Sequence, residues 1–113
     1  MKEWFSSLVR IVCLIEGVGG TRFMDCLYIF RSENFSTALK KALELGYSQE
    51  QEYLNESGER VRWAFKEVIS LDHLPENLDG CEVYSQPVDV PCEEHFEFSE
   101  EFDPASSKPT QTI

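Results

Sequence analysis

Apolar and polar residues alternate most regularly between residues 53 and 71, and this stretch predicts a β-hairpin. In its second arm the apolar residues fall on one face, namely Val61, Trp63, Phe65, Ile69 and Leu71. The opposite face carries polar residues, namely Arg60, Arg62, Lys66 and Ser70. The turn at residues 55–58 contains Asn and Gly, which readily accept positive φ. We therefore expect a long strand with one buried and one solvent-exposed face.

Two further strands are predicted near the N-terminus, at residues 4–15 and 21–31. The first is apolar on both faces, which is typical of a central strand. A glycine-rich turn at residues 17–20 would join the two strands into an antiparallel hairpin. A short helix is expected next, because Asn34 is a suitable N-cap and residues 38–45 show helical spacing. Gly46 is then well placed to end this helix.

A last short strand is predicted at residues 82–86, and Pro87 and Pro91 disfavour further strand pairing after it. The sequence therefore predicts an α+β fold with a single antiparallel sheet of about five strands and one helix packed on one face. The elements follow the chain order β-β-α-β-β-β. Residues 1–91 would form this single domain, and residues 92–113 an acidic, flexible C-terminal tail.

A sheet that carries only one helix leaves part of its second face bare. On the first strand, either Leu8, Val12 and Leu14 or the opposite set of residues would then be exposed. A homodimer across this face, or the tail folding back over it, would cover them.

The net charge of the chain restricts the classes of molecule that it can bind. The chain has 10 basic and 21 acidic residues, and its formal net charge is −11. This balance opposes direct binding to nucleic acid or to an anionic membrane, since both require a positive surface. A basic protein partner would suit it, although many proteins are acidic without any such purpose.

The four cysteines, Cys13, Cys26, Cys81 and Cys92, lack the close spacing of a zinc or redox motif. We interpret them as buried free thiols in a reducing cytoplasm. The N-terminus looks like a signal peptide, but Arg10 interrupts its apolar run and no small-residue cleavage site follows. No apolar run has the length of a membrane span. The expected location is therefore cytoplasmic.

Three stretches carry a resemblance to a known family: RSENFSTALKKALELG, NESGERVRWAFKEV and DGCEVYS. In this order they resemble the small bacterial family called domain of unknown function 4288. The resemblance extends from Trp4 to Ser85 and leaves out the acidic tail. It implies a bacterial cytosolic domain, and it brings no activity, cofactor or catalytic residue.

Few residues suggest chemistry. A phosphate-binding loop requires a helix after its glycines, whereas residues 17–20 lead into a strand, so we expect a hairpin turn there. Cys92 and His95 could supply two zinc ligands, but a structural zinc site requires four. His73 is interpreted as a turn residue at a strand end. We therefore predict no enzyme, no metal site and no cofactor.

Arg60, Arg62 and Lys66 form a basic stripe on the predicted central hairpin. One interpretation is cross-strand pairing with acids such as Glu52 or Glu82. The other is an anion-binding or carboxylate-binding site, for which the planar guanidinium group is well suited.

The tail alternates acidic and aromatic residues, and its candidate partner-binding residues are Phe96, Glu97, Phe98, Glu100, Glu101 and Phe102. Such a segment is too charged to fold alone, but it can dock as a strand or short helix on a basic, apolar groove. The groove could belong to another protein or to this one, and a solvated tail without any partner is the alternative.

Three functional hypotheses remain open. The leading one is a non-enzymatic protein–protein interaction module, with an immunity or antitoxin-like role as one example. The second is a small-molecule or anion-binding domain centred on Arg60, Arg62 and Lys66. The third is a structural subunit of a homo-oligomer.

Overall fold

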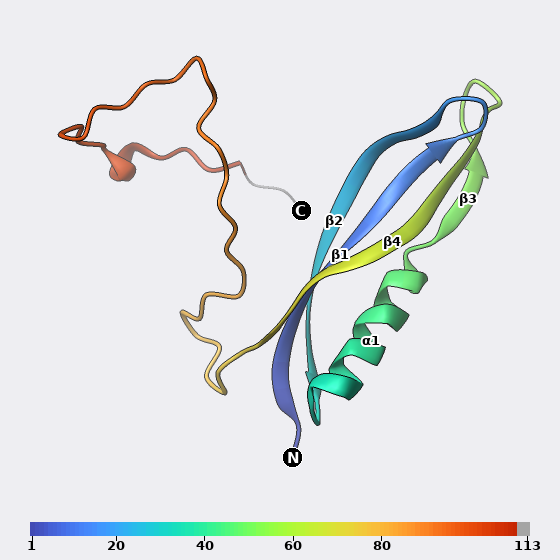
Figure 1. Cartoon of the computed structure of the whole chain (residues 1–113), viewed down its shortest axis with the longest axis horizontal. Helices are drawn as coiled ribbons and strands as arrows, with labels where there is room; N and C mark the ends of the chain where they lie inside the picture. Colours follow the sequence, from blue (N-terminus) through green and yellow to red (C-terminus); the bar gives the residue numbers. More distant parts are fainter. Residues whose placement is uncertain (111–113) are drawn as a thin grey trace.

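The computed structural model describes residues 1–110. Four strands form one antiparallel sheet: β1 (Glu3–Ile15), β2 (Gly19–Ser32), β3 (Gln51–Leu54) and β4 (Arg60–His73). Their spatial order is β2-β1-β4-β3, so β2 is an edge strand and β1 is central. The helix α1 (Phe35–Ser48) lies alongside the sheet, and a short 3₁₀ helix (Pro104–Ser106) lies in the tail (Figure 1). The predicted α+β class, with one α-helix and an antiparallel sheet, is confirmed.

The predicted fifth strand at residues 82–86 is wrong. No strand is present among the described residues after β4, so the sheet has four strands instead of about five. The segment nevertheless lies on the sheet, because the Ser6 hydroxyl donates a hydrogen bond of 3.0 Å to the Val83 carbonyl. It crosses the face of the sheet, where no strand edge offers backbone partners, and therefore forms no ladder.

The core lies on the face of the sheet that α1 covers, which we call the helix side. Phe5 of β1 and Phe30 of β2 pack there against Ala38 and Ala42, both of which are completely buried. The two alanines let the helix approach the sheet closely. Because side chains alternate along β1, Ser6, Leu8 and the other even-numbered residues lie on the opposite face, which we call the open face.

The helix begins as the sequence predicts but ends later. The Asn34 side chain accepts a hydrogen bond of 2.9 Å from the Thr37 amide, which satisfies one of the free donors of the first turn. Gly46 does not end the helix, which continues to Ser48 and is capped by Gln49. A Cβ atom at Gly46 would lie only 2.5 Å from the ring of Phe65. Glycine is therefore required for packing at this position and not for termination.

The strand β4 contains two β-bulges, which break its predicted alternation. Consecutive residues of β1 pair with Phe65 and Glu67, so Lys66 between them has no partner. In the same way, consecutive residues of β1 pair with Val68 and Ser70, so Ile69 has no partner. Ile69 therefore leaves the apolar row that the sequence assigns to it, and Lys66 leaves the register of the two arginines. Bulges increase the local twist of a strand, consistent with the curled sheet in Figure 1.

The molecule exposes much more surface than a compact chain of its size. Its accessible surface is 9076 Å², whereas a compact monomer of this mass exposes about 6,400 Å². Its radius of gyration is 18.6 Å, against about 13 Å for a compact domain of this length. Every residue from Ser85 to Thr110 is exposed, and so is most of β2. The excess surface thus belongs largely to the tail and to the edge strand.

Candidate functional site

The structure brings Arg60 and Arg62 together but separates them from Lys66. The two arginines line a hollow of about 480 Å³ that also contains Glu16 and Glu52. Lys66 lies in a bulge of β4, where its ammonium group pairs with Glu67.

The charges of this hollow cancel one another. The guanidinium group of Arg60 pairs with Glu52 and lies 3.6 Å from Glu16. The hydrogen bond that Arg60 donates to Glu52, supported by the nearby charges of Glu52 and Glu16, raises the pKa of Arg60 above its usual value. Both carboxylates lie close to Arg60, and no ion pair involves Arg62 among residues 1–110. Two acidic and two basic side chains line the hollow, so it offers little net attraction to an anion.

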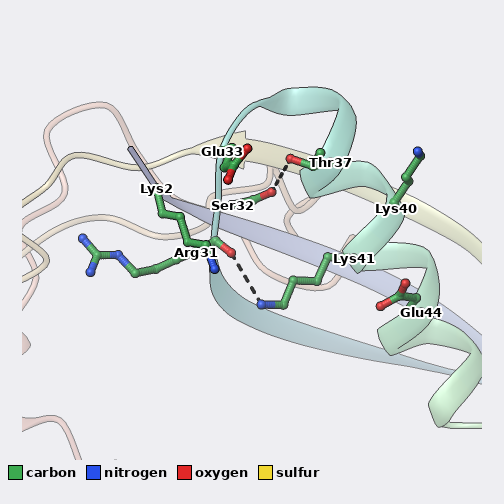
Figure 2. Close-up of a pocket in the computed structure, with 8 residues that line it drawn as sticks. All are labelled: Lys2, Arg31, Ser32, Glu33, Thr37, Lys40, Lys41 and Glu44. Atoms are coloured by element: carbon green, nitrogen blue, oxygen red, sulfur yellow. Dashed lines mark hydrogen bonds between the residues drawn. The ribbon is translucent and has the colours of Figure 1, made fainter.

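A second hollow, of about 380 Å³, lies between the start of α1 and the end of β2 (Figure 2). Its lining is rich in charged side chains: Lys2, Arg31, Ser32, Glu33, Thr37, Lys40, Lys41 and Glu44. Figure 2 shows that Arg31 and Lys40 point away from the hollow. Arg31 pairs instead with Glu76 at 2.9 Å, and Lys41 approaches the Arg31 carbonyl at 3.5 Å. The positive groups do not converge on one point, as an anion site would require.

The open face carries a paired charge cluster at its middle. Arg10 of β1 donates two hydrogen bonds, of 2.8 and 2.9 Å, to the two carboxylate oxygens of Asp25 in β2. The hydrogen bond from Arg10 lowers the pKa of Asp25 below its usual value. The guanidinium group of Arg10 also stacks over the ring of Phe23, 4.8 Å from its centroid. This cluster fixes side chains on β2 and leaves Asp25 neutralised.

A row of apolar side chains runs along the open face of β2 on both sides of Asp25. Phe23, Leu27 and Ile29 expose 53%, 41% and 45% of their surface. We call these three residues the β2 stripe. They share a face because their partners in β1, Val12, Leu8 and Ser6, lie on the open face.

The backbone edge beside the β2 stripe is also open. No strand of the described chain pairs with the outer edge of β2, which is 14 residues long. Edge strands in proteins are usually shortened, charged or covered, because their free N–H and C=O groups can pair with another chain. Of the charged residues of β2, Asp25 is neutralised by Arg10 and Arg31 pairs with Glu76, so Arg22 is the charge left without an ion pair among residues 1–110.

Only part of the open face is covered within the chain. Ser6 and Leu8 are buried on the side where the segment around Val83 crosses the sheet. Val12 and Leu14 are half-buried. The expectation of a partly bare second face therefore applies to β2 and not to Leu8. The sequence pattern placed the residues of the β2 stripe on one face, but it contained no signal for their exposure.

The predicted partner-binding residues of the tail are exposed. Phe96, Phe98 and Phe102 expose 48%, 108% and 65% of their surface. In the described part of the tail, residues 92–110, every hydrogen bond and ion pair is local. Figure 1 shows this part of the chain forming a wide loop that stands apart from the sheet. The glutamates of the predicted set, Glu97, Glu100 and Glu101, are exposed in the same way.

The described residues contain little that could support metal or redox chemistry. Within residues 1–110 there is no group of three His, Cys, Asp or Glu side chains placed to hold a metal ion. Cys13 is buried, Cys26 and Cys81 are half-buried, Cys92 is exposed, and none is in a disulfide. Burial raises the pKa of the Cys26 thiol, so it is a weaker nucleophile than an ordinary cysteine. No helix among residues 1–110 combines the length and apolar character that a membrane crossing requires.

Comparison with known proteins gives one match. A family model described as domain of unknown function (DUF4288) matches residues 4–85. No curated protein and no solved structure matches the chain. The matched region ends two residues after Val83 and so includes the segment that covers Ser6 and Leu8. It leaves out the whole tail.

Proposed function

The chain belongs to DUF4288, a domain family of unknown function, and we propose that it is a non-enzymatic protein–protein interaction module. Its binding surface is the edge of β2 together with the β2 stripe. The observation that carries this proposal is the coincidence of an unpaired strand edge with exposed apolar side chains on one element.

The backbone of β2 supports binding of an extended segment. A partner strand that lies along a free edge pairs its N–H and C=O groups with the edge strand, and these bonds give affinity without requiring a particular sequence. β2 offers 14 residues for this purpose, whereas β3, at the other edge, has only four.

The β2 stripe would supply specificity. A strand added to an edge continues the alternation of the sheet, so every second side chain of the partner would lie beside Phe23, Leu27 or Ile29. Apolar side chains at these positions would be preferred, because they bury the exposed stripe. The proposed partner is therefore a segment with aromatic or aliphatic residues at alternate positions.

The anion-binding alternative has weaker support. Its two arginines share their hollow with Glu16 and Glu52, and Lys66 pairs with Glu67. The free thiols support the further proposal that the protein works in a reducing compartment such as the cytoplasm. An immunity or antitoxin-like role would be one form of the proposed module.

Site-specific photo-crosslinking tests the proposal. A photoreactive amino acid replaces Leu27 in one variant and Leu54 in a control variant, because Leu54 is exposed on the short edge strand β3. Each protein is irradiated in a lysate of its host, and the adducts are identified by mass spectrometry. We expect a specific protein adduct at Leu27 that is absent at Leu54 and is lost when Ile29→Lys is added. Equal adducts at both positions, or none at Leu27, would refute the proposal.

A further inference from the structure

We propose that the edge of β2 binds the tail segment of a second copy of this chain, in a reciprocal two-fold dimer. The tail segment comprises residues 94–102. This inference rests on the proposed function, since it takes β2 as the binding edge, and it adds the identity of the occupant.

The tail segment has the alternation that β2 requires. Phe96, Phe98 and Phe102 fall on one side of an extended chain together with Glu94 and Glu100, while His95, Glu97, Ser99 and Glu101 fall on the other. Phe98 is completely exposed, and Phe96 and Phe102 are about as exposed as the residues of the β2 stripe. Each phenylalanine side chain can bury about 150–250 Å² of surface on docking. Two exposed apolar rows of matching period are thus present on each copy.

The opposite face of the added strand would lie beside a basic side chain of β2. With its phenylalanines on the open face, Glu97 and Glu101 would project on the helix side of the sheet, while Glu94 and Glu100 would remain on the open face. There β2 presents Met24 and Arg22, both exposed. Arg22 has no ion-pair partner among the described residues. Glu97 or Glu101 could pair with it, although the whole chain carries an excess of acid.

The described conformation shows what must change on docking. The tail segment contains a turn, closed by a hydrogen bond of 3.0 Å from the Glu100 amide to the Glu97 carbonyl. The ring of Phe96 packs against that of Phe102, with their centroids 5.4 Å apart. Docking would open this turn and replace one contact between two rings with contacts of all three rings to the β2 stripe. The new backbone bonds would replace the single bond of the turn.

The length of the linking chain allows exchange between two copies. The chain between Gln86 and Phe96 can span up to about 33 Å when extended, enough to reach a neighbouring molecule. Each copy has one long free edge, that of β2, and one free segment, so two copies can satisfy both with closed two-fold symmetry. The exchange would also bury part of the excess surface that the tail and β2 create.

The oligomeric state of five proteins tests the inference. Sedimentation velocity is measured over a range of concentrations for the full chain, for a chain ending at Pro91, and for the variants Leu27→Lys, Phe98→Lys and Val88→Lys. Val88 is exposed in the linking segment and serves as the control. We expect the full chain and Val88→Lys to dimerise, the chain ending at Pro91 to be monomeric, and the other two variants to dimerise at least ten-fold more weakly.

A mixing experiment separates this exchange from other dimers. Leu27→Lys damages the edge and leaves the tail segment intact, whereas Phe98→Lys does the reverse. An equimolar mixture should therefore form a heterodimer, held by one intact pair of edge and segment, more strongly than either variant self-associates.

Several results would overturn the inference. A dimer that persists in the chain ending at Pro91 would show another interface, such as pairing of two β2 edges. A full chain that stays monomeric at all concentrations would exclude the exchange, and a crosslink from Leu27 to its own tail would then show docking within one copy. If the photoreactive residue at Leu27 still captures a foreign protein in the lysate, the proposed function stands while this inference falls.

Discussion

Gly46→Ala tests the packing of α1 on the sheet. Alanine in a helix interior is more favourable than glycine by about 1 kcal/mol, so the substitution would stabilise an isolated helix. In this structure, however, the new Cβ would lie 2.5, 2.5 and 2.7 Å from three ring carbons of Phe65. Favourable carbon–carbon contacts lie at about 3.5–4.0 Å, so the ring must move by roughly 1 Å.

The movement has a cost that the contacts of Phe65 define. Its ring packs edge-on against Tyr47, with centroids 4.9 Å apart, and such a pair contributes about 0.5–1.5 kcal/mol. Overpacking of a core position costs about 1–3 kcal/mol in total. After the gain in helix propensity is subtracted, we expect Gly46→Ala to lower the free energy of unfolding by about 1 kcal/mol.

Urea unfolding followed by tryptophan fluorescence measures this change. The matched background is Phe65→Leu, because leucine lacks the three ring carbons that the new Cβ would meet. In that background Gly46→Ala should stabilise the protein by up to about 1 kcal/mol, so the two substitutions should couple by about 2 kcal/mol. A stabilising effect of Gly46→Ala in the natural sequence, or the same effect in both backgrounds, would contradict the packing role of Gly46.

Two further predictions concern the helix cap and the charge cluster. Asn34→Ala removes the acceptor for the Thr37 amide, and it should lower the free energy of unfolding by about 1 kcal/mol in the same urea assay; Asn34→Asp, which keeps the acceptor, should lose much less. Asp25 has a lowered pKa, so its pairing with Arg10 stabilises the folded state above the pKa of the unfolded chain and is lost as pH falls through the folded value. The difference in thermal stability between the natural sequence and Asp25→Asn should therefore be constant above pH ~5 and shrink below pH ~4. A difference independent of pH down to ~2 would show that Asp25 acts without its charge.

Local signals in the sequence were sufficient for most of the elements. The alternation at residues 4–15 and 21–31 predicted β1 and β2, and the Asn55–Gly58 turn forms as expected, with Gly58 at φ 78°. These elements follow from period and turn chemistry, which act over a few residues. The α+β class follows from their order.

Features that depend on contacts between distant residues could not be predicted. In the sequence Gly46 resembles a residue that ends a helix. Nothing near it in the sequence reveals that the ring of Phe65 packs against it. The bulge at Lys66 depends on how β4 matches β1, so the sequence wrongly aligned Lys66 with Arg60 and Arg62.

The exposure of the candidate site also depends on contacts between distant residues. The pattern placed Phe23, Leu27 and Ile29 on one face, yet exposure depends on which element lies over that face. Nothing in the local pattern indicates that the segment near Val83 covers β1 and leaves β2 free.

The segment that is held on the sheet by the hydrogen bond between Ser6 and Val83 marks a boundary in the chain. The parts before and after this boundary are under different structural constraints. Up to Ser85, where the family match ends, substitutions must preserve the closure of the sheet face. Beyond it, every described residue is exposed, so sequence and length can drift without disturbing the fold. Relatives could therefore keep one scaffold and the same β2 edge while their tails diverge in sequence and length.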